Sequence, residues 1–206
     1  LMIRRLPRCT LLPCTRLFRS LEKLSFYVRN LICGKWISGH AISEIQAGSD
    51  LNSLETVAQE NTDGFLLTGR KRYITNAPIA DILIVYALLD RQLTAFIVHR
   101  DDSGADFLNG PKTSGCSSST MGDVVLDHCL IPHQRRLGKA GGGSMIIQQA
   151  LEQERAFVFA GLCGVMAWQL DEVIDFSRKR KVNGAHLGKL EAISQDRKST
   201  RLNSSH

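Results

Sequence analysis

The sequence predicts an α+β protein, with an antiparallel β-barrel or sandwich domain followed by an incomplete helical-bundle domain. Two observations carry this prediction. Short runs of alternating apolar and polar residues, separated by polar turns, fill residues 36–137, and no helical period lies between them. After residue 144 the apolar period becomes helical and continues to about Lys179 without a proline.

Seven runs in the first part are expected to be strands because turn residues bound them and their apolar residues alternate or are β-branched. The tetrapeptide Asn61–Gly64 is a turn signal between two of these strands. The expected strands cover residues 37–44, 54–60, 65–68, 70–75, 82–89, 93–99 and 124–131.

One long helix is expected from Met145 to about Lys179. The glycine-rich residues 140–143 precede it, and Ser144 is a plausible N-cap. The basic residues at its end suit the negative pole of a helix dipole, and Gly184 is the expected stop. Its apolar surface is wide and little helical sequence follows it, so the second core is expected to be incomplete within this chain.

The net charge of +6 is concentrated at the two ends of the 206 residues. Residues 1–35 hold eight basic residues and one acidic residue, whereas residues 36–194 hold 15 basic and 18 acidic residues. A nucleic-acid-binding protein needs a basic face on a folded domain, so no nucleic-acid partner is expected. No apolar run is expected to span a bilayer.

The six cysteines are scattered, without a C-x-x-C pair or zinc-ligand spacing, which predicts no metal site and free thiols in a reducing compartment such as the cytoplasm. The first twenty residues are rich in arginine and lack acidic residues, so a mitochondrial transit peptide and a matrix location are the alternative. Pro7 and Pro13 interrupt any helix there and favour a non-native end. The cysteines are Cys9, Cys14, Cys33, Cys116, Cys129 and Cys163.

Four segments follow from these patterns. Residues 1–35 are a basic N-terminal extension, either the remnant of an N-terminal helical domain or non-native. Residues 36–139 form the β-domain, and residues 140–194 begin the helical domain. Residues 195–206 form a polar tail that is expected to be non-native.

Two runs carry residues suited to ligand binding. Residues 40–50 (HAISEIQAGSD) end in a small flexible turn, where Gly48 lets a backbone approach a ligand and Ser43 supplies a hydroxyl. Residues 70–76 (RKRYITN) place the aromatic face of Tyr73 near the hydroxyl of Thr75. Each run taken alone is more simply an ordinary turn or a strand with one packed aromatic side chain.

Taken together, the two runs resemble the acyl-CoA dehydrogenase family, whose usual form is T-E-x-x-A-G-S-D followed by L-x-G-x-K-x-W/F-I-T-N. Residues 41–50 and 64–76 carry this pattern, and residues 154–155 and 178–184 fall at family-like spacings. The resemblance covers residues 34–194. It implies that residues 36–139 bind FAD and that the protein is a homo-oligomer, commonly a tetramer.

The resemblance also implies roles for individual residues. Arg180 would reach the FAD diphosphate of a neighbouring subunit, and Ser49 and Arg155 would contact the substrate. The implied reaction is FAD-dependent α,β-dehydrogenation of an acyl-CoA thioester, with an electron-transfer flavoprotein as electron acceptor. A close variant would act on acyl groups tethered to a carrier protein. The implied FAD contacts are His40, Ile42, Ser43, Gly48, Ser49, Tyr73, Ile74, Thr75 and Arg180.

The catalytic base in this family is a glutamate, usually late in the C-terminal domain and in a minority of members at the position that matches Glu154. Glu154 shares a helical face with Leu151 and Val158, so a carboxylate there is expected to be desolvated and a better base. The alternative is a structural glutamate paired with an arginine.

Two functions of other classes stay open. The chain is expected to be poorly active alone, and it could be an inactive, truncated module that binds a partner through its uncovered helix. It could also be a β-plus-α domain with an unrelated function.

Overall fold

The computed structural model describes residues 21–116, 118–191 and 193, and the chain divides into two compact units, Leu1–Gln153 and Glu154–His206. The segment predicted as a transit peptide and the whole of the expected non-native tail lie outside the described residues. The first described element is helix α1 (Leu21–Ile32), within the segment expected to be an N-terminal extension.

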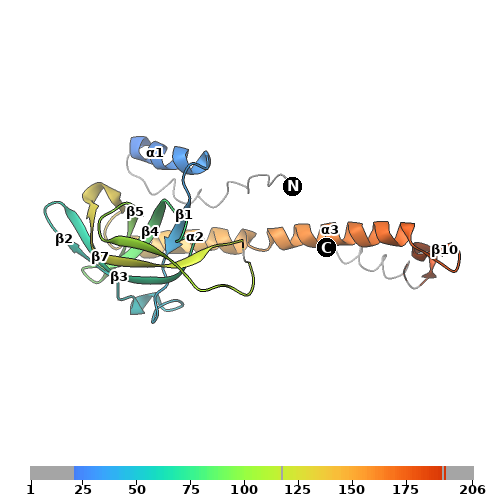
Figure 1. Cartoon of the computed structure of the whole chain (residues 1–206). Helices are drawn as coiled ribbons and strands as arrows, with labels where there is room; N and C mark the ends of the chain where they lie inside the picture. Colours follow the sequence, from blue (N-terminus) through green and yellow to red (C-terminus); the bar gives the residue numbers. More distant parts are fainter. Residues whose placement is uncertain (1–20, 117, 192, 194–206) are drawn as a thin grey trace. The chain divides into compact units, whose positions relative to one another are not determined.

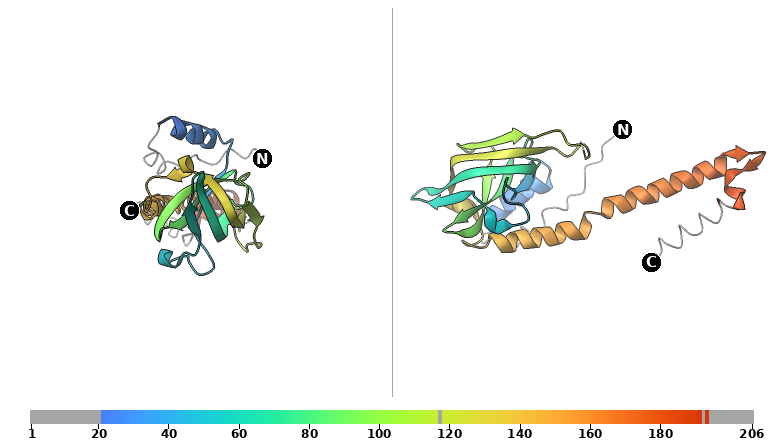
Figure 2. Two further views of the ribbon diagram at one scale, coloured as in Figure 1. Left: turned by 90° about the vertical axis from the view of Figure 1, so that its left-hand side faces the viewer. Right: turned by 90° about the horizontal axis from the view of Figure 1, so that it is seen from below.

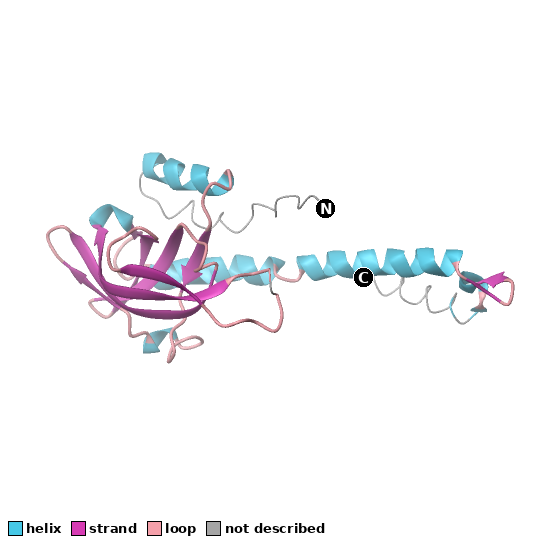
Figure 3. Ribbon diagram, in the orientation of Figure 1, coloured by secondary structure: helices cyan, strands magenta, loops and turns pink. Residues whose placement is uncertain are grey.

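The first unit is built on one eight-stranded mixed sheet (Figures 1 and 3). The strand order is β6-β7-β3-β2-β4-β5-β8, and β1 lies beside β4. The strands are β1 (Ser38–Ala41), β2 (Val57–Glu60), β3 (Gly64–Thr75), β4 (Ile82–Leu89), β5 (Gln92–His99), β6 (Ala105–Asn109), β7 (Met121–Pro132) and β8 (Arg136–Leu137).

The predicted α+β class is confirmed, but the sheet is neither wholly antiparallel nor closed into a barrel. Strands β1 and β2 both run parallel to β4, while the remaining neighbouring strands of this sheet are antiparallel. Turn signals describe only consecutive strands, so they could not reveal these two parallel pairings.

The turn at Asn61 is where the sequence placed it. The Asn61 side-chain oxygen accepts hydrogen bonds from the amides of Asp63 (3.0 Å) and Gly64 (2.8 Å). This turn joins β2 to β3 as an antiparallel pair. The two strands predicted after the turn are one long strand, β3, because irregular pairing with β7 interrupts the register without ending the strand.

Side chains of β4 alternate between two buried clusters. Leu83 and Val85 face the interior cluster with Phe96, whereas Ile84 and Tyr86 face a second cluster. The second cluster includes Ile146 and Ile147 of helix α2 (Gly143–Phe157), and Tyr27 and Leu31 of α1 pack against it. Because β4 is buried on both faces, its sequence is a continuous apolar run. Figure 2 shows the sheet of the first unit from two further directions.

The helix predicted from Met145 to Lys179 is in fact two helices. Helix α2 ends at Phe157, and α3 (Ala160–Lys179) begins after a turn at Val158 and Phe159. The consecutive residues Phe157, Val158 and Phe159, with Gly161 shortly after, combine poor helix formers, which explains the interruption.

The predicted end at Lys179 is confirmed, but Gly184 does not cap the helix. Asn183 (φ 49°) and Gly184 (φ 80°) instead form the turn of a small hairpin, β9 (Lys181–Val182) and β10 (Ala185–His186). An Asn-Gly pair suits this turn because both positions need positive φ.

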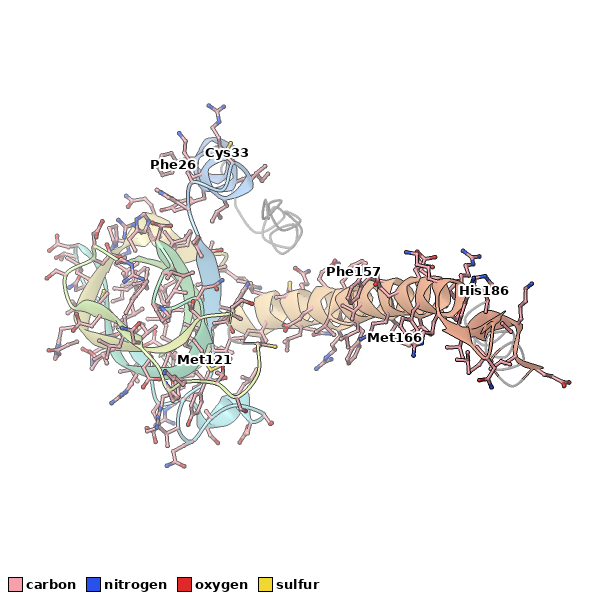
Figure 4. All side chains as sticks on the ribbon, turned by 45° about the vertical axis from the view of Figure 1, so that its right-hand side comes forward. Phe26, Cys33, Met121, Phe157, Met166 and His186 are labelled. Atoms are coloured by element: carbon pink, nitrogen blue, oxygen red, sulfur yellow. The ribbon has the colours of Figure 1, made fainter. Side chains whose placement is uncertain are left out.

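The surface of α3 carries many exposed apolar side chains, among them Leu162, Val165, Met166 and Trp168; Figure 4 labels Met166. By length and composition alone, Gly143–Lys179 is also apolar enough to cross a membrane. The expectation that no segment could do so is therefore not met on those criteria.

A bulge in β3 changes the direction in which the Tyr73 side chain points. The register against β7 shifts between Lys71 and Ile74, and Tyr73 has φ 58°, in the left-handed region. The Tyr73 ring is therefore 52% exposed, and the Arg72 guanidinium carbon lies 5.0 Å from its centroid. Asp123 accepts a 2.8 Å hydrogen bond from Arg70 and one from the Tyr73 amide at 3.4 Å, which holds the bulge in place.

The strained backbone at Tyr73 gives a stability prediction. Tyr73→Val places a β-branched residue at positive φ and should lower the free energy of unfolding by about 1–2 kcal/mol. Tyr73→Gly should leave it nearly unchanged, because relief of the strain offsets the flexibility of glycine, about 0.5–1 kcal/mol. Urea unfolding of the two variants measures the difference, and equal midpoints would show that backbone strain is not the cause.

Candidate functional site

The two runs singled out in the sequence lie side by side in the first unit. The Arg72 amide donates to the Ser43 carbonyl at 2.8 Å. The Asn76 side-chain amide donates to the Ser38 carbonyl at 3.1 Å. A Cβ on Gly39 would lie 2.5 Å from the Thr75 carbonyl oxygen, so the backbones of the two runs are in direct contact.

The side chains at this junction leave polar groups available. Ser43 is half-buried, and Ser49 and Thr75 are exposed. None of their hydroxyls has a hydrogen bond to another described residue. A Cβ on Gly48 would meet no described atom within 4 Å, so there is open space at that turn. Hydroxyls without a hydrogen bond to another described residue, together with the exposed side chain of Tyr73, suit a flat ligand with polar edges, as an isoalloxazine is.

Three of the predicted contact residues instead use their side chains for packing. The His40 Nδ1 shares a 3.0 Å hydrogen bond with the Tyr86 hydroxyl, and burial lowers the pKa of His40, which keeps the ring neutral near pH 7. Ile42 packs against the second cluster, and Ile74 is buried in the interior cluster. The carbonyls of these two residues are also occupied, because that of Ile42 accepts from the Lys71 ammonium and that of Ile74 accepts from the Ala77 amide.

A buried ion pair between Lys71 and Glu44 lies at the junction, and the sequence alone assigns no role to either residue. The Lys71 ammonium lies 2.7 Å from the Glu44 carboxylate, with 0% and 5% of the two side chains exposed. Thr56 also donates to Glu44 through its hydroxyl (2.5 Å) and its amide (3.1 Å), and the Glu55 amide donates at 2.6 Å. The signal was present, because both charged residues belong to the family-like pattern, but their pairing is long-range.

The same contacts set the ionisation of the pair. Burial alone would raise the pKa of Glu44, but the hydrogen bonds from Lys71, Thr56 and the Glu55 amide outweigh it and lower the pKa. Burial lowers the pKa of Lys71, and the Glu44 carboxylate opposes that shift. The carboxylate is therefore charged at neutral pH, and its hydrogen bonds keep it so.

The other predicted site residues belong to the second unit. Glu154 and Arg155 are exposed on α2, and Arg180 is the exposed residue that follows α3. The desolvation expected for Glu154 is not found in this chain, because Glu154 and Val158 are both exposed. Desolvation of Glu154 requires a cover over this helix face, and the sequence already predicts that the second core is incomplete within this chain.

A cavity of about 350 Å³ lies near the end of β3, where the Asn76 amide donates to the Thr120 carbonyl at 2.8 Å. None of the residues that line this cavity was predicted as a site residue from the sequence. Within the described ranges, no three His, Cys, Asp or Glu side chains gather in a way that could hold a metal ion. The cavity is lined by Pro78, Asn109, Gly110, Pro111, Lys112, Thr113, Ser119, Thr120 and Met121.

The four cysteines in the described part of the chain, Cys33, Cys116, Cys129 and Cys163, are free thiols, as the sequence predicted. Cys9 and Cys14 lie outside the described residues. Burial raises the pKa of the Cys129 thiol to about 12, so this thiol is protonated and unreactive at neutral pH.

Two family models match consecutive parts of the chain. Residues 39–129 match the acyl-CoA dehydrogenase middle domain, and residues 141–200 match the acyl-CoA dehydrogenase C-terminal domain. The first match contains both runs at the junction and the Glu44–Lys71 pair.

Individual relatives agree with these matches. The chain is 35% identical to an L-prolyl-[peptidyl-carrier protein] dehydrogenase of Pseudomonas fluorescens, over 86% of this chain and 48% of that protein. It is 33% identical to a mitochondrial 2-methylacyl-CoA dehydrogenase of Solanum tuberosum, over 81% of this chain and 42% of that protein. The solved structure of PigA with FAD and proline superposes with a TM-score of 0.81 at 27% identity, covering 95% of this chain and 52% of that one.

The chain thus spans about half the length of the curated relatives it matches. Both family models, the relatives and the junction of the two sequence runs agree. The chain belongs to the acyl-CoA dehydrogenase family, of which it carries the middle domain and the start of the C-terminal domain.

Proposed function

We propose that the complete protein is an FAD-dependent acyl-CoA dehydrogenase and that this chain carries its flavin-binding β-domain. The observation that supports this most directly is the junction of the two runs, which the Arg72–Ser43 backbone hydrogen bond joins. There the Ser43 and Thr75 hydroxyls have no hydrogen bond to another described residue, and Tyr73 is exposed. Bound FAD supplies the acceptor for the hydride that leaves the β-carbon of the acyl thioester.

The residues of the junction would bind and orient the flavin. The hydroxyls of Ser43 and Thr75 can donate to or accept from the polar edge of the ring, and the Tyr73 ring can cover part of its face. The open turn at Gly48 leaves room for a ribityl or phosphate group, and Ser49 would contact the thioester substrate. Arg180 would bind the diphosphate through its guanidinium fork.

Removal of the α-proton requires a carboxylate that none of these residues provides. We propose Glu154 as that base, once further helical sequence covers the face it shares with Leu151. The alternative is a glutamate outside this chain, with Glu154 in a structural role beside Arg155.

The substrate is an acyl thioester, and two carriers for it compete. Coenzyme A is the first candidate. A carrier protein is the second, since relatives of both kinds match this chain: the prolyl-carrier enzyme at 35% identity and the 2-methylacyl-CoA enzyme at 33%. The complete protein should turn over one thioester at least tenfold faster than the other when matched CoA-bound and carrier-bound acyl groups are compared. Equal rates would contradict a dedicated carrier.

We further propose that an electron-transfer flavoprotein accepts the electrons, that the protein is a homo-oligomer, and that it works in the cytoplasm or the mitochondrial matrix. Free thiols in the described part of the chain support a reducing compartment. The exposed apolar side chains of α3 are proposed to pack within the C-terminal helical domain. An inactive module that binds a partner through α3 is the competing proposal.

Flavin binding by the purified chain is the first test. FAD should give a bound absorption band and quenched fluorescence, and Thr75→Val should weaken affinity by up to about tenfold, the value of one hydrogen bond. Ser103→Ala is the matched control, since Ser103 is an exposed hydroxyl in the turn between β5 and β6. If Thr75→Val binds FAD as tightly as the unmodified chain, Thr75 has no role in flavin binding.

The identity of the base is tested in the complete protein. Glu154→Gln should lower turnover by about 10²–10⁴-fold with little change in FAD absorbance, because only proton abstraction is lost. Glu152→Gln is the control, because Glu152 is an exposed neighbour whose described hydrogen bond is from Gln148. Turnover within a few-fold of the unmodified enzyme would place the base outside this chain.

A further inference from the structure

We propose that the buried Glu44–Lys71 pair is a positioning device that fixes the backbone around Ser43 and the turn that carries Ser49. Neither charged side chain needs to touch the cofactor. This inference rests on the proposed flavin site, because it assigns a purpose to the geometry of that site.

Lys71 contacts the residues on both sides of Ser43. Its ammonium donates to the Glu44 carboxylate at 2.7 Å and to the Ile42 carbonyl at 3.2 Å. The next residue, Arg72, donates its amide to the Ser43 carbonyl at 2.8 Å. Strand β3 thus holds two successive carbonyls on either side of the Ser43 Cα, which restricts rotation of the Ser43 backbone and sets where its hydroxyl points.

Glu44 extends the same constraint to the following turn. Its own amide donates to the Ala47 carbonyl at 2.6 Å, which closes the turn before Gly48 and Ser49. Its carboxylate accepts from the amide of Glu55 and from both donors of Thr56. The turn is therefore tied at its base to a segment outside the run.

That segment is itself fixed to the core. The Thr56 carbonyl accepts a hydrogen bond from the Leu88 amide of β4 at 2.9 Å. A Cβ on Gly69 of β3 would lie within 2.8 Å of three Thr56 atoms, so the two backbones are closely packed. The pair therefore connects the ligand-facing run to two strands, β3 and β4, rather than to one.

The choice of charged residues needs a reason beyond stability. Replacing a buried ion pair with apolar residues of similar volume is often neutral or stabilising, so burial alone does not explain this one. An apolar pair could fill the same space, but it could not donate to the Ile42 carbonyl or accept from Thr56 and Glu55. Directional hydrogen bonds to a backbone that must be held still are the property that the charges add.

The test uses the full chain with three sets of variants. Glu44→Gln/Lys71→Met removes both charges together, and Glu44→Gln alone keeps an acceptor for Thr56. The control is Asp102→Asn/Arg135→Met, which removes another ion pair of the same unit, with contacts of 2.6 and 2.7 Å. Neither Asp102 nor Arg135 has a hydrogen bond to residues 38–50 or 70–76 among the described contacts.

The first readout is amide hydrogen exchange without flavin. Peptides covering residues 38–50 should exchange at least tenfold faster in Glu44→Gln/Lys71→Met, and to a smaller degree in Glu44→Gln. Peptides covering β4 and β5 should keep the exchange rates of the unmodified chain. The control pair should leave residues 38–50 unchanged. Unmodified rates at residues 38–50 in both Glu44 variants would overturn the inference, and the single variant decides it if the double variant does not fold.

The second readout is the dissociation constant for FAD, measured by fluorescence quenching. It should rise at least tenfold in Glu44→Gln/Lys71→Met and stay unchanged in the control pair. Faster exchange with unchanged FAD affinity would overturn the positioning role. If the unmodified chain and the complete protein both fail to bind FAD while the exchange pattern holds, the proposed function fails and the backbone role of the pair stands.

Discussion

The structure of the β-domain depends on the pairing of one buried ammonium with one buried carboxylate. Lys71 and Glu44 come from segments 27 residues apart, and each would be a costly unpaired charge without the other. Any conformation that excludes water from the interior must therefore bring the run after β1 onto β3. The pair thereby selects one arrangement of the loops among the many that hydrophobic burial alone would allow.

A second feature, the backbone conformation of Tyr73, lowers the stability of the β-domain locally. Tyr73 occupies a left-handed backbone conformation that an L-residue adopts at a cost of about 1–3 kcal/mol. The Tyr73 side chain stays largely exposed, so burial does not offset this cost. The buried Asp123 carboxylate, 8% exposed, accepts the hydrogen bonds that hold the bulge. Such strain is expected at positions where an exposed side chain must be held ready for a ligand. The two features lie two residues apart on β3, at Lys71 and Tyr73, so one strand carries both the constraint and the strain.

The sequence predicted the elements whose signals are local. Strands β4, β5 and β7 are long apolar runs bounded by turn residues, and the Asn61 turn satisfies its own amides, so each can be read without knowing the rest of the fold. Strand β6 was missed because Ala105–Asn109 is short and contains Asp106 and Asn109, which are poor strand formers.

The long-range features could not be read in the same way. Parallel pairing of β1 and β2 with β4 brings together segments far apart in the chain, and the pairing of Glu44 with Lys71 depends on that arrangement. Both charged residues belong to the family-like pattern, but the pattern alone assigns neither of them a role. It also named His40 and Ile74 as ligand contacts, although their side chains pack against Tyr86 and the interior cluster. A motif records which residues occur together, and only the fold assigns each side chain to a face.

Many of the exposed apolar side chains of the second unit lie in a stretch of sequence without charged residues. Between Arg155 and Asp171 no Asp, Glu, Lys or Arg interrupts the sequence, a run of 15 residues. A bilayer-spanning helix needs about 20 predominantly apolar residues, and a charged side chain near the bilayer centre costs roughly 2.5–3.5 kcal/mol. A span of that length centred on this run would place Glu154 and Arg155 or Asp171 and Glu172 near the two ends of the hydrocarbon rather than at its centre. A protein helix bundle imposes no such minimum, and its edges tolerate those charges in water. The match of residues 141–200 to the acyl-CoA dehydrogenase C-terminal domain agrees with packing against other helices, as expected at the start of a helical domain.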